Sequence, residues 1–307
     1  QALDELVSTP FFWTDKAESF GGRNLILWIW PLLYLYGALY KLFGLNNDLI
    51  IRIVFYFPAI ILSSLSPILL ARYFHLSKTV QFFSSLVYSL NTYFLLVVDG
   101  GQVGVALAYG IFPLAILFLN KLLFLKARLT FLVCFVTFNL LLISDVRLGL
   151  IALFTVLVFL IFKKLNVKEI NYPRLFIFLF LSLGINMYWI LPFVKESGLA
   201  NQIEISNFNS ISLLNGLLLF QPYWPINEFG KVLSPPFYFA GVIVLIFGGI
   251  ILSRSKLSFV FAACFLIFVF LSKGASPPFG ELYETFLKYF PFGGAFRDSS
   301  KFFVPLF

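Results

Sequence analysis

Long runs of apolar residues, separated by short polar connections, are the feature that most limits what this chain can fold into. Several of these runs reach the ~17–25 residues that a helix needs to cross a bilayer. Of the 307 residues, 60% are hydrophobic and only 12% are charged, whereas soluble domains carry about 25% charged residues. The charged residues are too few to cover a soluble globule of this size. The chain is therefore predicted to be an integral membrane protein, and disordered, fibrous and ordinary soluble-enzyme classes are excluded.

The apolar runs predict helices. They are too long for strands and lack the alternation of a membrane β-barrel. We expect an all-α, polytopic transmembrane helix bundle with about 8–10 membrane segments. The expected segments are 25–43, 50–71, 79–98, 103–120, 129–144, 147–162, 175–194, 233–253 and 258–272, with a tenth beginning at 302.

We expect a single transmembrane domain over residues 1–307. Because the chain starts without Met and its last residues resemble the start of another span, we expect it to be part of a longer protein. The predicted parts are an external loop plus a membrane-embedded segment (1–49), a helix bundle (50–194), an external loop (195–232), a helix pair (233–272), an external loop (273–301) and the start of a further span (302–307).

The basic residues predict the orientation. Every second connection from 72–78 onward is rich in Lys and Arg, and these connections together hold eleven basic residues against one acid, Glu169. By the positive-inside rule this set is cytoplasmic, so 195–232 and 273–301 face outside. The eleven are Arg72, Lys78, Lys121, Lys126, Arg128, Lys163, Lys164, Lys168, Arg174, Arg254 and Lys256.

Segment 25–43 leaves two orientations open for the N-terminus. If it crosses the membrane, residues 1–24 are cytoplasmic; if it is re-entrant or lies in the interface, they are external. Trp28, Trp30, Tyr34 and other aromatic residues make the segment typical of interfacial ones. We expect an external N-terminus.

The sequence lacks the strong signatures of soluble enzymes. It has no P-loop, no dinucleotide-binding glycine pattern, no H-E-x-x-H and no paired C-x-x-C. Its one histidine, His75, lies in a basic connection, which makes Ser-His-Asp or Cys-His catalysis improbable. Cys134 and Cys264 lie inside apolar runs, where cysteine behaves as a small hydrophobe. The positive charges stand in short loops, so no nucleic-acid partner is expected.

Any chemistry then falls to charged residues at the predicted outer face. Charges at membrane depth are costly and face a cavity or a partner more often than lipid. For each one, however, a structural ion pair or a snorkelling role is the stronger interpretation. The candidates are Asp4, Asp15, Glu18, Arg52, Asp99, Asp145, Arg147, Arg297 and Lys301.

Several short phrases occur in an order similar to that of the N-terminal membrane region of GT-C glycosyltransferases. The chain most resembles the prokaryotic branch that includes arabinofuranosyltransferase D and YfhO-like proteins. The phrases are Trp13-x-Asp15 before Gly21-Gly22-x-Asn24, Gly44-Leu45 before Arg52, Gly100-Gly101-Gln102 before Ala108-Tyr109 and Pro113, Asn186-x-x-Trp189-x-x-Pro192, Ser272-Lys273-Gly274 with Ser276-Pro277-Pro278-Phe279-Gly280, and Phe290-Pro291 before Phe296-Arg297-Asp298-x-x-Lys301-Phe302.

The resemblance implies an enzyme in a prokaryotic plasma membrane that works on the extracytoplasmic side. Its partners would be the bilayer, a polyprenyl-phosphate sugar donor and a glycan, lipid or protein acceptor. A carboxylate in the first external loop would be the catalytic base, which points to Asp15 or Asp4. The resemblance also implies a segment 25–43 that does not cross the membrane.

The remaining candidates fit substrate binding, since Arg can hold two phosphate oxygens of a lipid-linked donor. No ligand spacing demands a metal or another cofactor, although a divalent ion on the acids stays open. The competing class is a non-catalytic flippase or transporter of lipid-linked sugars. That class would need charges and broken helices near the middle of the membrane.

Overall fold

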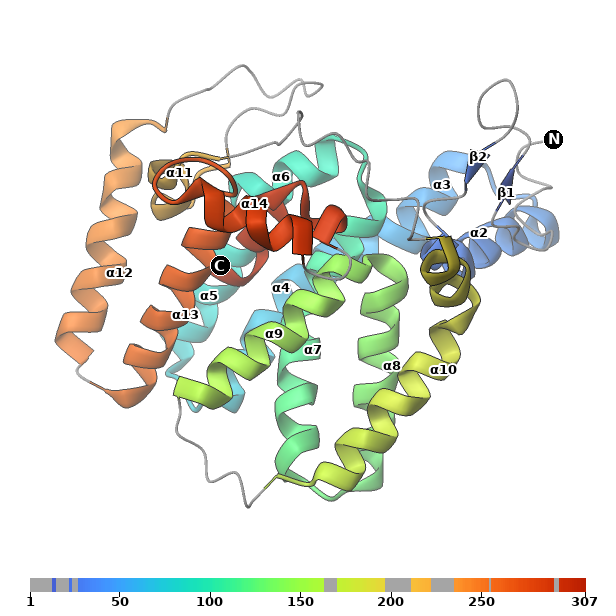
Figure 1. The fold of residues 1–307 in the computed structure, drawn as a ribbon, viewed down its shortest axis with the longest axis horizontal. Helices are drawn as coiled ribbons and strands as arrows, with labels where there is room; N and C mark the ends of the chain where they lie inside the picture. Colours follow the sequence, from blue (N-terminus) through green and yellow to red (C-terminus); the bar gives the residue numbers. More distant parts are fainter. Residues whose placement is uncertain are drawn as a thin grey trace.

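The computed structural model describes residues 13–14, 22–23, 27–162, 170–196, 211–221, 235–253, 255–289 and 293–307. Within this part the fold is helical apart from one antiparallel pair of two-residue strands, which confirms the all-α prediction (Figure 1). The elements are β1 Trp13–Thr14, β2 Gly22–Arg23, η1 Leu27–Ile29, α2 Trp30–Phe43, α3 Asn47–Ile51, the π-helical turn η2 Arg52–Tyr56, α4 Phe57–Tyr73, α5 Lys78–Ser89, α6 Thr92–Asp99, α7 Val103–Phe124, α8 Arg128–Ser144, α9 Val146–Phe162, α10 Tyr172–Glu196, α11 Leu213–Leu217, η5 Phe237–Phe239, α12 Ala240–Ser253, α13 Lys256–Ser272, α14 Gly280–Tyr289, η6 Gly293–Phe296 and η7 Ser299–Leu306.

Four helical stretches are long and apolar enough to cross a membrane. They are Asn47–Tyr73, Lys78–Asp99, Val103–Phe124 and Tyr172–Val194. These four spans indicate a membrane protein, and each overlaps a segment expected from the sequence. Four further apolar helices are shorter: Arg128–Ser144, Val146–Ile161, Phe237–Ser253 and Lys256–Ser272. A helix of 17 residues rises about 25 Å, somewhat less than the ~30 Å hydrocarbon core.

Helix α7 forms the centre of the bundle. It is apolar all round and is buried along most of its length, as expected of a helix enclosed by others. Helix α4 packs closely against it at Gly110, where an added Cβ would lie 2.8 Å from the carbonyl oxygen of Ala59. Small residues permit such close helix contacts in membrane bundles.

The helix ends that flank the four basic connections lie at one end of this bundle, which we call the basic end. The backbone N–H of Asn171 donates to the Leu123 carbonyl at 3.3 Å, which joins the start of α10 to the end of α7. The Phe74 ring lies 5.3 Å from Phe159 on α9 and 5.4 Å from Phe261 on α13. The helix ends concerned lie along the lower edge of Figure 1.

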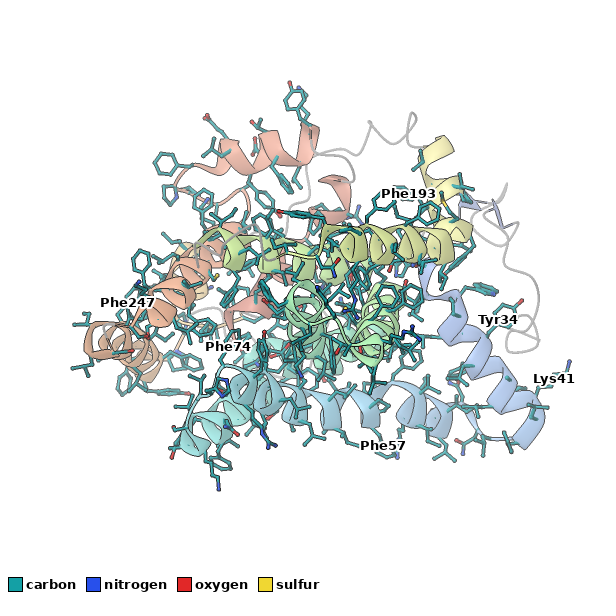
Figure 2. All side chains as sticks on the ribbon, turned by 90° about the horizontal axis from the view of Figure 1, so that it is seen from below. Tyr34, Lys41, Phe57, Phe74, Phe193 and Phe247 are labelled. Atoms are coloured by element: carbon teal, nitrogen blue, oxygen red, sulfur yellow. The ribbon has the colours of Figure 1, made fainter. Side chains whose placement is uncertain are left out.

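Helices α2, α6 and α14 lie across the opposite end, which we call the polar end (Figure 1). In Figure 2, which views the molecule from below, α7 and α8 are seen end-on while α2, which carries Tyr34 and Lys41, lies in the plane. The 14 residues of α2 end at Gly44, whose φ of 61° stops the helix. What distinguishes α2 from the shorter apolar helices is therefore its direction, which is transverse to α7 and α8 (Figure 2).

Two local features differ from the expected segments. The expected helix 79–98 lies within the single apolar stretch Lys78–Asp99 but is divided into α5 and α6, because the Asn91 side chain accepts from the Phe94 N–H at 2.8 Å and caps α6. Where a further span is expected to begin, the structure describes a buried 3₁₀ helix, η7, in which Phe303 is fully buried, and the span itself stays a prediction. Pro305 within it lacks the N–H that a regular α-helix would use.

Candidate functional site

The junction of α8 and α9 holds one acid and one base at the polar end. Asp145 leaves α8 in an extended conformation, and its Oδ1 accepts from the Arg147 N–H at 2.9 Å at the start of α9. The same carboxylate binds the Arg147 guanidinium, through Nε at 3.0 Å and Nη2 at 2.6 Å. A carboxylate is favourable at a helix N-terminus, and the two-pronged contact fixes the guanidinium. The tight connection expected from the sequence is thus a cap combined with an ion pair.

A second ion pair comes from η7. Lys301 is fully buried, and its Nζ lies 3.1 Å from Asp298 Oδ2 and donates to Gln102 Oε1 at 3.2 Å. Asp298 also accepts from the Ser300 N–H at 3.1 Å and so caps η7. The Lys301 contacts therefore attach the end of the chain to the start of α7, 199 residues away in sequence.

The two ion pairs act on one another electrostatically. Burial lowers the pKa of Lys301, while Asp298 and Asp145 counteract this and Arg147 adds to it. Burial alone would raise the pKa of Asp298, but Lys301 and the bonds from Ser300 bring it below its ordinary value. Two cations and two anions thus share one buried region, which we call the tetrad: Asp145, Arg147, Asp298 and Lys301.

Two hydroxyl groups at the tetrad lack a hydrogen bond of ordinary geometry. Tyr93 is fully buried, its ring lies 6.0 Å from Lys301 Nζ, and its hydroxyl has no such partner. Ser300 is 2% exposed, and its hydroxyl likewise has no hydrogen bond of ordinary geometry. The Ser300 side chain nevertheless interacts with both Tyr93 and Asp298, so the two hydroxyls belong to the same polar cluster as the tetrad.

The tetrad reaches the surface unevenly. The side chains of Asp145 and Lys301 are 2% and 1% exposed, whereas those of Arg147 and Asp298 are 23% and 18% exposed. Asp145 takes Nε and Nη2 of Arg147, which leaves Nη1 outside that contact. The partly accessible members of the tetrad are therefore Arg147, whose guanidinium is held by its carboxylate, and Asp298.

The structure brings together three of the nine candidates, Asp145, Arg147 and Lys301. Three others, Arg52, Asp99 and Arg297, have exposed side chains. Asp4, Asp15 and Glu18 lie outside the described residues.

Sequence reasoning gave no role to Gln102, Tyr93 or Lys273. Lys273 is fully buried, and its Nζ donates to the carbonyls of Gly274 at 3.3 Å and Ser276 at 2.7 Å. It also lies 4.5 Å from the centre of the Phe270 ring. The phrase Ser272-Lys273-Gly274 was the sequence pattern that could have indicated it. In the structure, Lys273 stabilises the loop that follows α13 through these two carbonyl contacts.

Two other phrases from the sequence have structural explanations. Asn186 on α10 donates to Asn139 on α8 at 2.8 Å and accepts from the Trp189 indole at 2.9 Å. Tyr109 on α7 donates to the Tyr88 carbonyl at 2.6 Å, and Tyr88 donates to the Tyr109 carbonyl at 2.8 Å. Both networks join helices inside the bundle.

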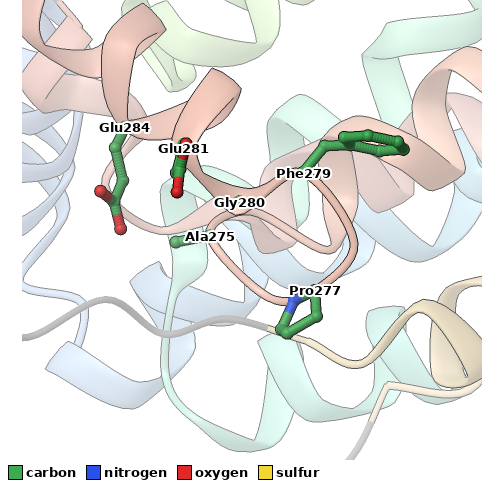
Figure 3. A pocket seen from close by; sticks show the side chains of 6 residues that line it. All are labelled: Ala275, Pro277, Phe279, Gly280, Glu281 and Glu284. Atoms are coloured by element: carbon green, nitrogen blue, oxygen red, sulfur yellow. The ribbon is translucent and has the colours of Figure 1, made fainter.

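The surface carries two shallow depressions. One of about 370 Å³ lies beside α14, where the carboxylates of Glu281 and Glu284 flank it (Figure 3). The other, about 440 Å³, is almost entirely apolar and is lined by Trp30, Pro31, Tyr34 and Tyr188. In the part of the chain that the structure describes, no three His, Cys, Asp or Glu residues come together as metal ligands would.

Comparison with protein-family models, with curated proteins and with solved structures gives no match to this chain. The site is therefore interpreted from its own geometry and chemistry.

Proposed function

We propose that this protein is a polytopic membrane glycosyltransferase that takes a sugar from a polyprenyl-phosphate donor. The observation that carries the proposal is the tetrad, a buried cluster of two cations and two carboxylates where the apolar helices end. A donor lipid would present its phosphate at that level, with its prenyl chain in the bilayer. The resemblance to GT-C glycosyltransferases supports the same reaction.

The proposed topology has eight crossings. The four long spans and the four shorter apolar helices would cross the membrane, while α2 would lie in the interface. The basic end would face the cytoplasm by the positive-inside rule. The tetrad would then face outside, in the plasma membrane of a prokaryote.

Arg147 is the residue that we assign to the donor phosphate. Its guanidinium is partly exposed and already oriented by Asp145, so little conformational entropy is lost when a phosphate binds. Asp145 is then a positioning residue. Lys301, which is buried beneath the surface and held in place by Asp298, would add positive electrostatic potential at the phosphate. Arg52, Arg297, Asp99 and Glu18 stay proposed contacts at the rim.

The proton of the acceptor hydroxyl needs a separate base. Asp145 and Asp298 are each engaged with a cation, so both carboxylates are already used within the tetrad. The role therefore stays with Asp15 or Asp4, as the resemblance implies. The carboxylate would take the proton as the acceptor oxygen attacks the anomeric carbon and the lipid phosphate departs. The acceptor would be an extracytoplasmic glycan, lipid or protein, and a divalent ion could assist.

A non-catalytic flippase or transporter of lipid-linked sugars is the competing proposal. Such proteins carry charges and broken helices near the middle of the membrane. The described tetrad instead lies where helices begin or end, at the α8–α9 junction and the start of α7. This placement favours the enzyme.

A transfer assay on the intact protein in liposomes tests the proposal. We expect sugar to leave a polyprenyl-phosphate donor in the presence of an envelope membrane fraction as acceptor source.

The variant Arg147→Lys tests the assigned phosphate contact, because it keeps the charge but loses the two-pronged geometry. Losing one charge-assisted contact, about 1.5–3 kcal/mol, would lower transfer roughly 10- to 150-fold. Arg128→Ala at the basic end is the control and should leave transfer unchanged. Movement of intact donor between leaflets without sugar transfer would support the flippase.

A further inference from the structure

Helix α14 carries three different surfaces along its ten residues. Glu281, Glu284 and Lys288 recur at helical spacing and form a charged stripe. Leu282 and Tyr289 form an apolar stripe beside it and are 60% and 73% exposed, while Phe286 next to them packs inward against the rings of Tyr283 and Phe296.

A third surface of α14 faces inward and fixes how the helix is rotated. Tyr283 is 3% exposed, and its hydroxyl donates to the Phe296 carbonyl at 2.6 Å. Its ring lies 6.4 Å from Phe302 of η7, edge to face. Because Tyr283 anchors α14 from below, neither the charged nor the apolar stripe can turn into the protein.

The position of α14 matches the level at which the spans end. It lies across the polar end in Figure 1 and at the periphery of the bundle in Figure 2. Ten residues rise only about 15 Å, half of the hydrocarbon thickness, so α14 cannot cross the membrane. A peripheral, transverse helix at this level meets the boundary between lipid and water.

We propose that α14 is an interfacial helix whose partner is the lipid bilayer itself. Leu282 and Tyr289 lie among the headgroups and upper acyl chains, and Glu284 and Lys288 lie in water. This division follows the amphipathic character of helices that lie in the membrane plane, whose apolar faces reach ~5–10 Å into the boundary. Lipid is favoured over a protein partner because the apolar stripe lies at the perimeter, where the exposed side chains of the spans also meet lipid. The inference does not depend on the glycosyltransferase proposal.

The position of the depression beside α14 relative to the membrane depends on how that helix binds lipid. Glu281 and Glu284 flank it and belong to the charged stripe, as Figure 3 shows for their side chains. With the apolar stripe held in lipid, this depression opens at the aqueous edge of the headgroup layer. Binding of α14 to lipid therefore sets the height of the 275–284 region above the membrane.

Site-directed spin labelling in nanodiscs tests the proposal. Single cysteines at Leu282→Cys and Glu284→Cys, in a Cys134→Ala/Cys264→Ala background, differ by two positions on the same helix. We expect the label at 282 to be accessible to oxygen, shielded from a water-soluble nickel chelate and ~5–10 Å below the boundary. The label at 284 should show the reverse. Leu266→Cys on α13 and Lys126→Cys at the basic end serve as lipid and water references.

Equal accessibility of the two labels to the nickel chelate would overturn the proposal. Shielding of both labels from oxygen and chelate would also overturn it, because it would indicate a protein partner over α14. Since the label could disturb the helix, Tyr289→Trp provides a second measurement. We expect quenching of its additional fluorescence by brominated lipids, and no such quenching would contradict lipid contact. Neither result bears on sugar transfer, so the two proposals fail separately.

Discussion

Asp145 binds Arg147 through two nitrogens of the guanidinium, at 3.0 and 2.6 Å, and only one residue, Val146, separates them in sequence. The carboxylate is almost fully buried and the guanidinium is partly exposed. The pair therefore joins the interior of the bundle to its polar end. The contribution of the pair to stability and its contribution to function can be measured separately by changing Arg147 alone or both residues together.

Removing one partner of this pair should destabilise the protein more than removing both. Arg147→Ala leaves a buried carboxylate without its cation, and we expect a loss of about 3 kcal/mol or more in unfolding free energy. In Asp145→Asn/Arg147→Met no buried charge is left unpaired, so the double variant should lose less than the sum of the single variants. Unfolding in mild detergent measures the double-mutant cycle. Strict additivity would show that the pair is not coupled.

The Asp298 and Lys301 pair predicts how stability changes in acid. The pKa of Asp298 is lower in the folded protein than its ordinary value, because Lys301 and Ser300 outweigh the effect of burial. A carboxyl group of this kind stabilises the fold fully above its unfolded pKa of about 3.9 and loses this contribution as pH falls through its folded pKa. Thermal unfolding between pH 3 and 7 should therefore show a smaller acid loss in Asp298→Asn than in the natural protein. Parallel pH profiles would contradict this assignment.

The contact between α4 and α7 predicts opposite effects for two glycines. An added Cβ at Gly110 would meet Ala59 O at 2.8 Å and Leu62 Cβ at 3.0 Å, while one at Gly184 on α10 would meet nothing within 4 Å. We expect Gly110→Ala to cost about 1–3 kcal/mol through overpacking. Gly184→Ala is the matched control and should stabilise by up to about 1 kcal/mol, since Ala favours helix more than Gly. Equal effects in thermal unfolding would show that α4 and α7 do not approach so closely.

The proposed orientation predicts which ends of the helices react with an impermeant thiol reagent. A cysteine at Glu284, at the polar end, should be labelled in intact cells, whereas one at Lys126 should react only after the cells are opened. Both positions are exposed in the structure, so accessibility alone cannot explain a difference. Labelling of Lys126→Cys but not Glu284→Cys in intact cells would reverse the topology.

The helices could be predicted from sequence because hydrophobic runs act locally. The stretches 50–71, 103–120 and 175–194 each lie within a described span. The grouping of the basic connections also followed from their sequence order. In the site, the proximity of Asp145 and Arg147 could be predicted, because residues two positions apart at a helix junction stay close in space.

Lys301 was also a predicted site residue, but its contacts could not be predicted in this way. Lys301 reaches Gln102 across 199 residues, and no local pattern encodes a contact at that separation. Lys273 was overlooked because an isolated lysine after an apolar run resembles a solvated helix end, whereas its Nζ is turned to the carbonyls of Gly274 and Ser276. Phe302 and Phe303 are buried against other parts of the chain, and a sequence pattern does not distinguish this burial from burial in lipid, because both select the same residues.

The central claim is that the tetrad serves transfer of a sugar from a lipid phosphate. The most direct measurement is the amount of labelled sugar that the intact protein removes from a polyprenyl-phosphate donor in liposomes, compared between Arg147→Lys and the Arg128→Ala control. We predict measurable transfer that falls roughly 10- to 150-fold in Arg147→Lys, in line with one lost charge-assisted contact, and is unchanged in Arg128→Ala. Equal transfer by both folded variants, or none by the natural protein while intact donor crosses the bilayer, would contradict the claim.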